Sequence, residues 1–151
     1  MKKGYTYIWF IALFVSVVSF GCKKKVKPVS ERIAKAWTAD LVNHGNVVVY
    51  ARAGSANTWP GYSDFRLSLT TVSGENKVTY VEWNKDSFTG TWELQGDTKL
   101  ILKNLVPQPT GSSGTIEFTI TSLDDNTLVL TRTSASKKTG DTINSYTLSS
   151  L

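Results

Sequence analysis

Few residues of this 151-residue chain are of types that carry out chemistry, and these few stand apart from one another. The chain has one cysteine, Cys22, and one histidine, His44. A zinc site made of Cys and His needs several such ligands, and an internal disulfide needs two cysteines, so the sequence excludes both. His44 falls in the turn signal His44-Gly45-Asn46, where we expect a turn residue and not a general base.

No motif for catalysis accompanies these residues. The sequence contains no Gly-x-Ser-x-Gly elbow, no phosphate-binding loop and no His-Glu-x-x-His helix. Glu82 alternates in phase with Val78 and Tyr80, so we expect it to face inward and to pair with an arginine. The turn at 124–126 is too short for a calcium loop. The sequence therefore predicts a protein that is not an enzyme and uses no metal and no cofactor.

The basic charge of the chain is concentrated at its start. There are 17 Lys and Arg against 12 Asp and Glu, a net charge of +5. Six of the 17 precede position 28 without any acidic residue, and they are Lys2, Lys3, Lys23, Lys24, Lys25 and Lys27. The other 11 basic and 12 acidic residues leave the rest at a net −1, which argues against a nucleic-acid partner.

Residues 1–21 have the pattern of a bacterial secretion signal, with Lys2 and Lys3 before the apolar run 7–20. This run is shorter than the roughly 20 residues that a spanning helix needs, although an uncleaved membrane anchor is the alternative. Ser19-Phe20-Gly21-Cys22 resembles the lipobox of bacterial lipoproteins, in which Leu is preferred at the place of Ser19. The resemblance implies that Cys22 becomes the first residue and carries acyl chains that anchor it in the membrane.

Residues 22–32 then form a basic tether between the lipidated cysteine and the folded domain. Its lysines can rest on anionic headgroups, and a solvated spacer is the alternative. Surface-exported lipoproteins of some Gram-negative groups carry acidic residues at this place, whereas this chain has lysines. We therefore expect a lipid-anchored protein in the envelope of a Gram-negative bacterium, at the outer membrane and facing the periplasm.

From position 33 onward, apolar and polar residues alternate with period two, which is typical of half-buried strands. In one such segment Phe65, Leu67 and Leu69 share a face. Turn signals separate nine expected strands, at 36–43, 46–52, 64–72, 77–83, 89–95, 98–105, 114–122, 126–133 and 142–149. The one helix candidate is a short turn at 28–35 with Ser30 as its cap.

Short links between these strands favour antiparallel neighbours. Because no long helix is available to cover the apolar face, the sheet must cover itself as a closed barrel or a sandwich. A barrel also removes exposed edges. We predict an all-β fold in which residues 33–151 form a single antiparallel up-and-down barrel of eight or nine strands, preceded by a short helical turn.

Two segments resemble the lipocalin-like domains of small bacterial lipoproteins. In the first, residues 33–40, a helical turn enters the first strand through Trp37; in the second, residues 90–102, a Gly-Thr-Trp strand is followed by a turn and an apolar strand. In lipocalins an Arg of a late strand stacks on the first-strand Trp, which implies this role for Arg132. The alternative is that Arg132 binds a fatty-acid-like carboxylate.

Two binding functions are open for such a barrel. Its interior could hold a small hydrophobic molecule, although the same residues could equally fill the barrel as a core. The expected lining residues are Tyr50, Phe65, Leu67, Tyr80, Trp92, Phe118 and Arg132. Alternatively, the loop 53–63 presents Trp59 and Tyr62 to a glycan or protein partner, unless these aromatic residues form a lid over the barrel. We expect a monomer.

Overall fold

The computed structural model describes residues 26–54 and 57–151. The predicted signal sequence and the lipidation site at Cys22 lie outside the described residues. No helix among the described residues is long and apolar enough to cross a membrane.

The described chain is built almost entirely of strands. They are β1 (Ala36–His44), β2 (Val47–Ala51), β3 (Arg66–Val72), β4 (Glu75–Val81), β5 (Ser87–Gln95), β6 (Lys99–Val106), β7 (Ile116–Leu123), β8 (Thr127–Arg132) and β9 (Asn144–Ser150). A short helix, α1 (Val29–Ile33), precedes them, and two 3-10 turns, η1 (Pro60–Asp64) and η2 (Lys137–Thr139), lie between strands. The nine expected strand segments are thus confirmed with small shifts at their ends.

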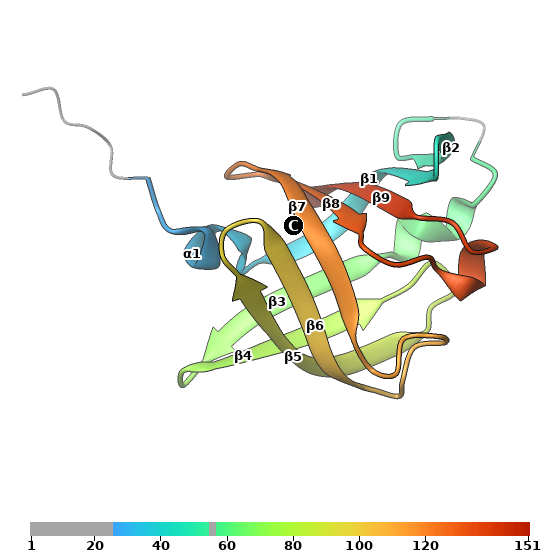
Figure 1. Cartoon of the computed structure of the whole chain (residues 1–151). Helices are drawn as coiled ribbons and strands as arrows, with labels where there is room; N and C mark the ends of the chain where they lie inside the picture. Colours follow the sequence, from blue (N-terminus) through green and yellow to red (C-terminus); the bar gives the residue numbers. More distant parts are fainter. Residues whose placement is uncertain (1–25, 55–56) are drawn as a thin grey trace, which may run out of the picture.

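All neighbouring strands pair antiparallel and in chain order from β3 to β9, and β1 closes the sheet by pairing with β9 (Figure 1). One edge of β1 follows β9 along its length. The other edge is shared, because Ala36–Thr38 pairs with β3 and Leu41–His44 pairs with β2. The predicted all-β, up-and-down barrel is confirmed as eight closed strands, with β2 as a ninth strand outside the ring.

Two local expectations are wrong. The helix is shorter than 28–35, and Pro28, not Ser30, occupies its N-cap without a side-chain hydrogen bond. Period-two alternation from Tyr50, one of the expected lining residues, would also place Val48 inside the barrel, but Val48 is 56% exposed. The pairing of β1 with β2 passes over Val49, and this bulge reverses the phase of the side chains along β2.

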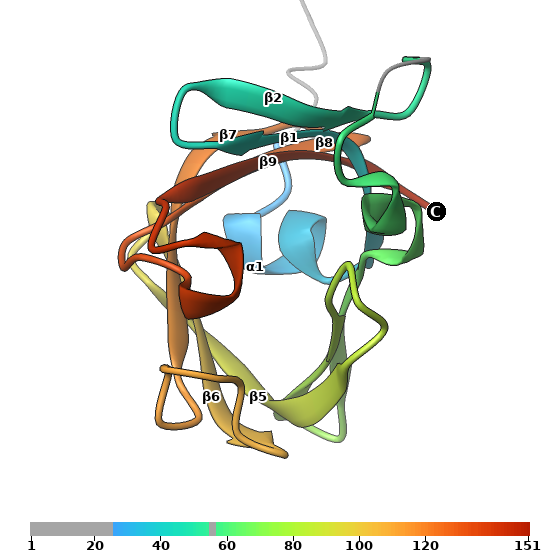
Figure 2. The same cartoon turned by 90° about the vertical axis from the view of Figure 1, so that its right-hand side faces the viewer.

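One end of the barrel is closed by α1, which Figure 2 shows within the ring of strands. Ile33 is fully buried, and its carbonyl accepts a 2.8 Å hydrogen bond from the Trp37 indole Nε1. The ammonium of Lys35 lies 5.7 Å from the centre of the same indole ring. A tryptophan, a helix residue and a lysine from one local segment therefore close this end together.

The expected stacking of Arg132 on Trp37 is wrong, because the two residues lie toward opposite ends of the barrel. Trp37 pairs with Ser150, next to the start of β8, whereas Arg132 is the last residue of β8. The residue before it, Thr131, pairs with Ser145 near the other end of β9. The resemblance implied that the cation beside Trp37 would be Arg132, but in the structure this cation is Lys35.

Candidate functional site

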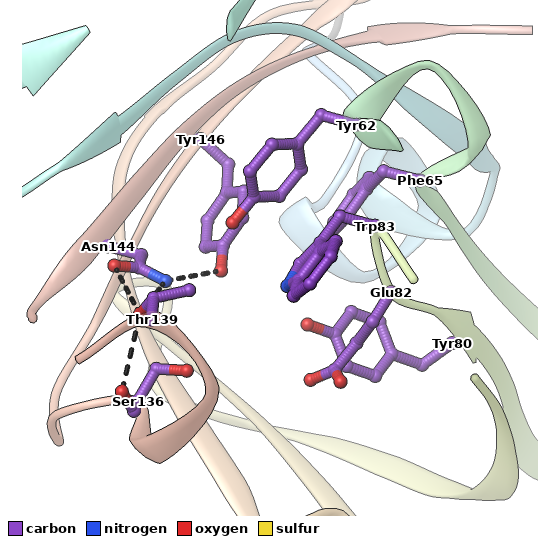
Figure 3. Close-up of a pocket in the computed structure, with 9 residues that line it drawn as sticks. All are labelled: Tyr62, Phe65, Tyr80, Glu82, Trp83, Ser136, Thr139, Asn144 and Tyr146. Carbon is purple, nitrogen blue, oxygen red and sulfur yellow. Dashed lines mark hydrogen bonds between the residues drawn. The ribbon is translucent and has the colours of Figure 1, made fainter. Parts of the chain in front are cut away.

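The end of the barrel opposite α1, here called the mouth, is covered by three segments that connect strands. These are η1, the turn 82–86, and the loop 133–143 that contains η2. Beneath them lies a cavity of about 10 Å³, roughly the space of one water molecule. Figure 3 shows its lining, which consists of Tyr62, Phe65, Tyr80, Glu82, Trp83, Ser136, Thr139, Asn144 and Tyr146.

The segment η1 brings aromatic side chains onto the mouth. Pro60 begins the turn, where its fixed φ is favourable and its missing N–H is not needed. Tyr62 is 1% exposed, and its hydroxyl lies 2.7 Å from Nε2 of His44. The Trp59 ring makes edge contacts with the rings of His44 and Trp83 at 4.7 and 4.6 Å between centroids. Trp59 and Tyr62 therefore have the positions expected of a lid.

His44 is the last residue of β1 and is buried, so the expectation of a simple turn residue is wrong. The closing pair of β1 and β9 joins His44 to Asn144, which carries the imidazole to the mouth. Burial lowers the pKa of His44 below its ordinary value of 6.5. The neutral ring can accept a hydrogen bond from the Tyr62 hydroxyl.

A buried ion pair holds η2 over the mouth. Lys138 Nζ donates to Glu82 Oε2 at 2.6 Å and to Asp86 Oδ2 at 2.5 Å, and it lies 5.2 Å from the centre of the Phe88 ring. Glu82 does face inward, as predicted, but its partner is this lysine and not an arginine. We call the group of Lys138, Glu82 and Asp86 the latch.

The charges of the latch support one another. Burial by itself would lower the pKa of Lys138, but the hydrogen bonds to Asp86 and Glu82 outweigh it, and the pKa is raised above 10.5. The same bond from Lys138, together with one from Asn84, lowers the pKa of Asp86 below 3.8. Lys138 and Asp86 are thus both charged at neutral pH.

Neutral hydrogen bonds complete the attachment of the η2 loop. The Asn144 side chain donates from Nδ2 to Thr139 Oγ1 at 3.0 Å and to the Tyr146 hydroxyl at 3.4 Å (Figure 3). Its Oδ1 accepts a 2.7 Å bond from Thr142 Oγ1. Lys138, Ser136 and Thr139 could not be found from the sequence, because no alternation marks residues of an irregular loop. Asn144 lies in the expected strand 142–149, but nothing in the alternation marked it as a polar residue of the mouth.

The predicted lining residues are distributed over the whole barrel. Phe65 and Tyr80 line the mouth cavity, and Phe118 contacts the ring of Tyr146 there. Leu67 and Trp92 are buried in the core away from this cavity. Tyr50 is buried too, but it lies on β2 outside the ring and faces Tyr62.

Arg132 also lies inside the barrel, as predicted, and is 6% exposed. Its guanidinium makes no ion pair with any described residue, and its Nε has no hydrogen-bond partner among them. Burial raises the pKa values of Tyr62, Tyr80 and Tyr146, while the charge of Arg132 opposes this effect at all three phenols.

Within residues 26–54 and 57–151, no group of three or more potential metal ligands is found.

No protein-family model matches the chain, and no curated protein matches it either. Among solved structures, a lipocalin-like protein from Bacteroides uniformis is 11% identical with a TM-score of 0.47, over 80% of this chain and 99% of that one. An uncharacterized protein from Bacteroides eggerthii is 11% identical with a TM-score of 0.44, over 78% and 98%. The barrel is lipocalin-like in its own strand order and closure.

Proposed function

We propose that this protein is a monomeric binding protein without catalytic activity, held at the cell envelope through a lipid on Cys22. Its barrel takes up a small hydrophobic molecule through the mouth. The observation that carries this proposal is the difference between the two ends of the barrel. The helix α1 closes one end, where Ile33 and Trp37 are fully buried, whereas loops that connect strands, held in part by the latch and by Asn144, cover a small cavity at the other.

The polar attachment matters because the mouth must open for a ligand to enter. Ligand pockets usually measure about 300–1,000 Å³, and the mouth cavity of about 10 Å³ is far smaller. The loop 133–143 takes part in none of the strand pairs that close the barrel, so in this proposal it is the segment that moves. Its turn uses left-handed residues, Gly140 at φ 75° and Asp141 at φ 61°, where the chain can reverse direction.

The chain enters the barrel at the end where an anchor would leave the mouth free. The described residues start at Val26, beside α1, so the tether reaches the barrel at the end opposite the mouth (Figure 1). A lipid on Cys22, facing the periplasm from the outer membrane of a Gram-negative bacterium, would therefore leave the mouth turned toward solvent. The alternative of a glycan or protein partner on the loop 53–63 is less favoured, since Tyr62 is buried and Trp59 packs onto His44.

The test is to detect the ligand and its place of binding. Full chain purified in detergent is extracted with organic solvent, and the extract is analysed by mass spectrometry for bound hydrophobic molecules. Fatty acids are then titrated while tryptophan fluorescence is followed, because Trp59 and Trp83 lie at the mouth. We expect a recovered molecule and a saturable fluorescence change.

The matched control is the double variant Trp59→Phe, Trp83→Phe, which keeps Trp37 and Trp92 as fluorophores away from the mouth. Its fluorescence should change much less on titration than that of the unaltered chain. An empty extract combined with an unchanged signal in both proteins would exclude the proposed function.

A further inference from the structure

Trp83 carries a buried hydrogen-bond donor that no neighbouring side chain or carbonyl uses. Its indole Nε1 is buried, and no described residue accepts a hydrogen bond from it. The other buried indoles differ in this respect. Trp37 Nε1 donates to the carbonyl of Ile33 at 2.8 Å. Trp92 Nε1 donates to the carbonyl of Thr70 at 3.1 Å. Because a buried N–H without an acceptor destabilises a fold, native structures usually supply it with a partner.

The mouth cavity lies beside this nitrogen. Trp83 lines the cavity, and Figure 3 shows its indole nitrogen turned toward the space between the hydroxyl groups of Tyr80 and Tyr146. Ser136, which is 5% exposed, adds a hydroxyl group from the loop above. Cavities that stay dry are lined by apolar groups. This cavity has a polar lining, and its volume of about 10 Å³ is the volume that one ordered water occupies.

The chemistry of the lining selects the occupant. The Glu82 carboxylate accepts a hydrogen bond from Lys138 through Oε2, and Oε1 remains available to a further donor. Trp83 brings only a donor, because an indole N–H cannot accept. The indole N–H disfavours a cation and the carboxylate disfavours an anion, so the occupant must be neutral and must both accept and donate. Water does both, and the volume excludes larger molecules.

We infer that the mouth cavity is the binding site of one structural water molecule. This water accepts a hydrogen bond from Trp83 Nε1 and donates to oxygen atoms that line the same space, those of Glu82 and Ser136 among them. Trp83 belongs to the turn 82–86 and Ser136 to the loop 133–143, so the water joins two of the segments that cover the mouth, in addition to the latch. The site is occupied whether or not the barrel takes up a ligand.

The direct test is a crystal structure of the full chain, purified in detergent, at a resolution that shows ordered waters. We expect one water in the cavity, with its oxygen about 2.7–3.2 Å from Trp83 Nε1, the ordinary range of an N–H···O hydrogen bond. An empty cavity would overturn the inference. A metal ion there, or a water that leaves Trp83 Nε1 without an acceptor, would overturn it as well.

A second measurement tests in solution whether the cavity needs its water. The backbone of Ser136 is extended, at φ −93° and ψ 116°, which suits a β-branched residue. Ser136→Val adds volume to the lining and should displace the water, which leaves Trp83 Nε1 unpaired. Ser136→Ala is the matched control, because it keeps the space for the water. We expect the Tm of the valine variant to lie about 3–8 °C below that of the alanine variant.

The order of the two Tm values distinguishes a wet cavity from a dry one. In a dry cavity the extra methyl groups of valine would fill space and stabilise the fold. A Tm of Ser136→Val equal to or above that of Ser136→Ala would therefore overturn the inference. A lower Tm supports it together with the water seen in the crystal, since overpacking also lowers Tm. If Ser136→Val fails to fold, the crystal structure of the unaltered chain decides.

Discussion

At the scale of single residues, the mouth contains a histidine, His44, that is only 8% exposed. His44 contacts the Tyr62 hydroxyl and the ring of Trp59, and burial lowers its pKa below 6.5. The folded chain therefore binds a proton at His44 less readily than the unfolded chain does. Protonation would place a charge against Trp59 and remove the ring nitrogen that accepts from Tyr62.

We predict that the stability contributed by His44 is fully present above pH 6.5 and is lost as the pH falls through the lower pKa of the folded state. His44→Gln keeps an acceptor for Tyr62 but does not titrate, so its Tm should fall less between pH 7 and pH 5. Thermal denaturation followed by near-UV circular dichroism at several pH values checks this. Identical pH profiles for the two proteins would contradict it.

At the scale of elements, η2 is held mainly by the latch. Its two ion pairs differ in exposure, since the Glu82 side chain is 8% exposed and that of Asp86 is 51% exposed. The buried pair carries most of the effect, because removing one member leaves the other desolvated and unpaired. The raised pKa of Lys138 and the lowered pKa of Asp86 keep their stabilising contribution complete between pH 3.8 and pH 10.5.

Replacing Lys138 with Met should lower the free energy of unfolding by about 2–3 kcal/mol, because Glu82 is left buried without its partner. The neighbouring Lys137 offers the matched control. It pairs with Asp141 in solvent, where both side chains are more than half exposed, so Lys137→Met should cost less than about 1 kcal/mol. Urea denaturation of the two variants measures the difference, and equal losses would show that the latch does not hold η2.

At the scale of the whole molecule, the basic N-terminal segment and the barrel differ in charge. The positive charge lies before position 28, while the rest of the chain is near neutral and forms the barrel. The described chain begins at the closed end of the barrel. An anchor at Cys22 would therefore lie toward the end of the barrel opposite the mouth.

Cys22→Ser tests the anchor in the bacterial envelope. We expect the unaltered chain to partition into the detergent phase and to show, by intact mass, cleavage before Cys22 and added acyl groups. The serine variant should lack the acyl mass, because serine offers no thiol for the thioether bond. If the variant partitions like the unaltered chain and keeps residues 1–21, an uncleaved apolar segment is the anchor instead.

Much of the fold could be predicted because it depends on local pattern. Phe65, Leu67 and Leu69 alternate with polar residues, and all three are buried on one face of the sheet. Turn residues between such segments fixed where strands end, and the lack of a long helix left the sheet to cover itself. Period-two alternation sets the buried face of a strand wherever that strand pairs, so the strands, their buried faces and their antiparallel order were determined by the sequence alone.

The mouth was decided only by the tertiary structure. Lys138 reaches Glu82 across 56 positions of sequence, and His44 meets Tyr62 through a loop that carries no alternation. The bulge at Val49 and the closing pairs of β1 and β9 placed β2 outside the ring and Arg132 far from Trp37. Local residue types do not encode strand register or barrel closure, because these arise when the whole sheet minimises its exposed apolar surface and unpaired edges at once.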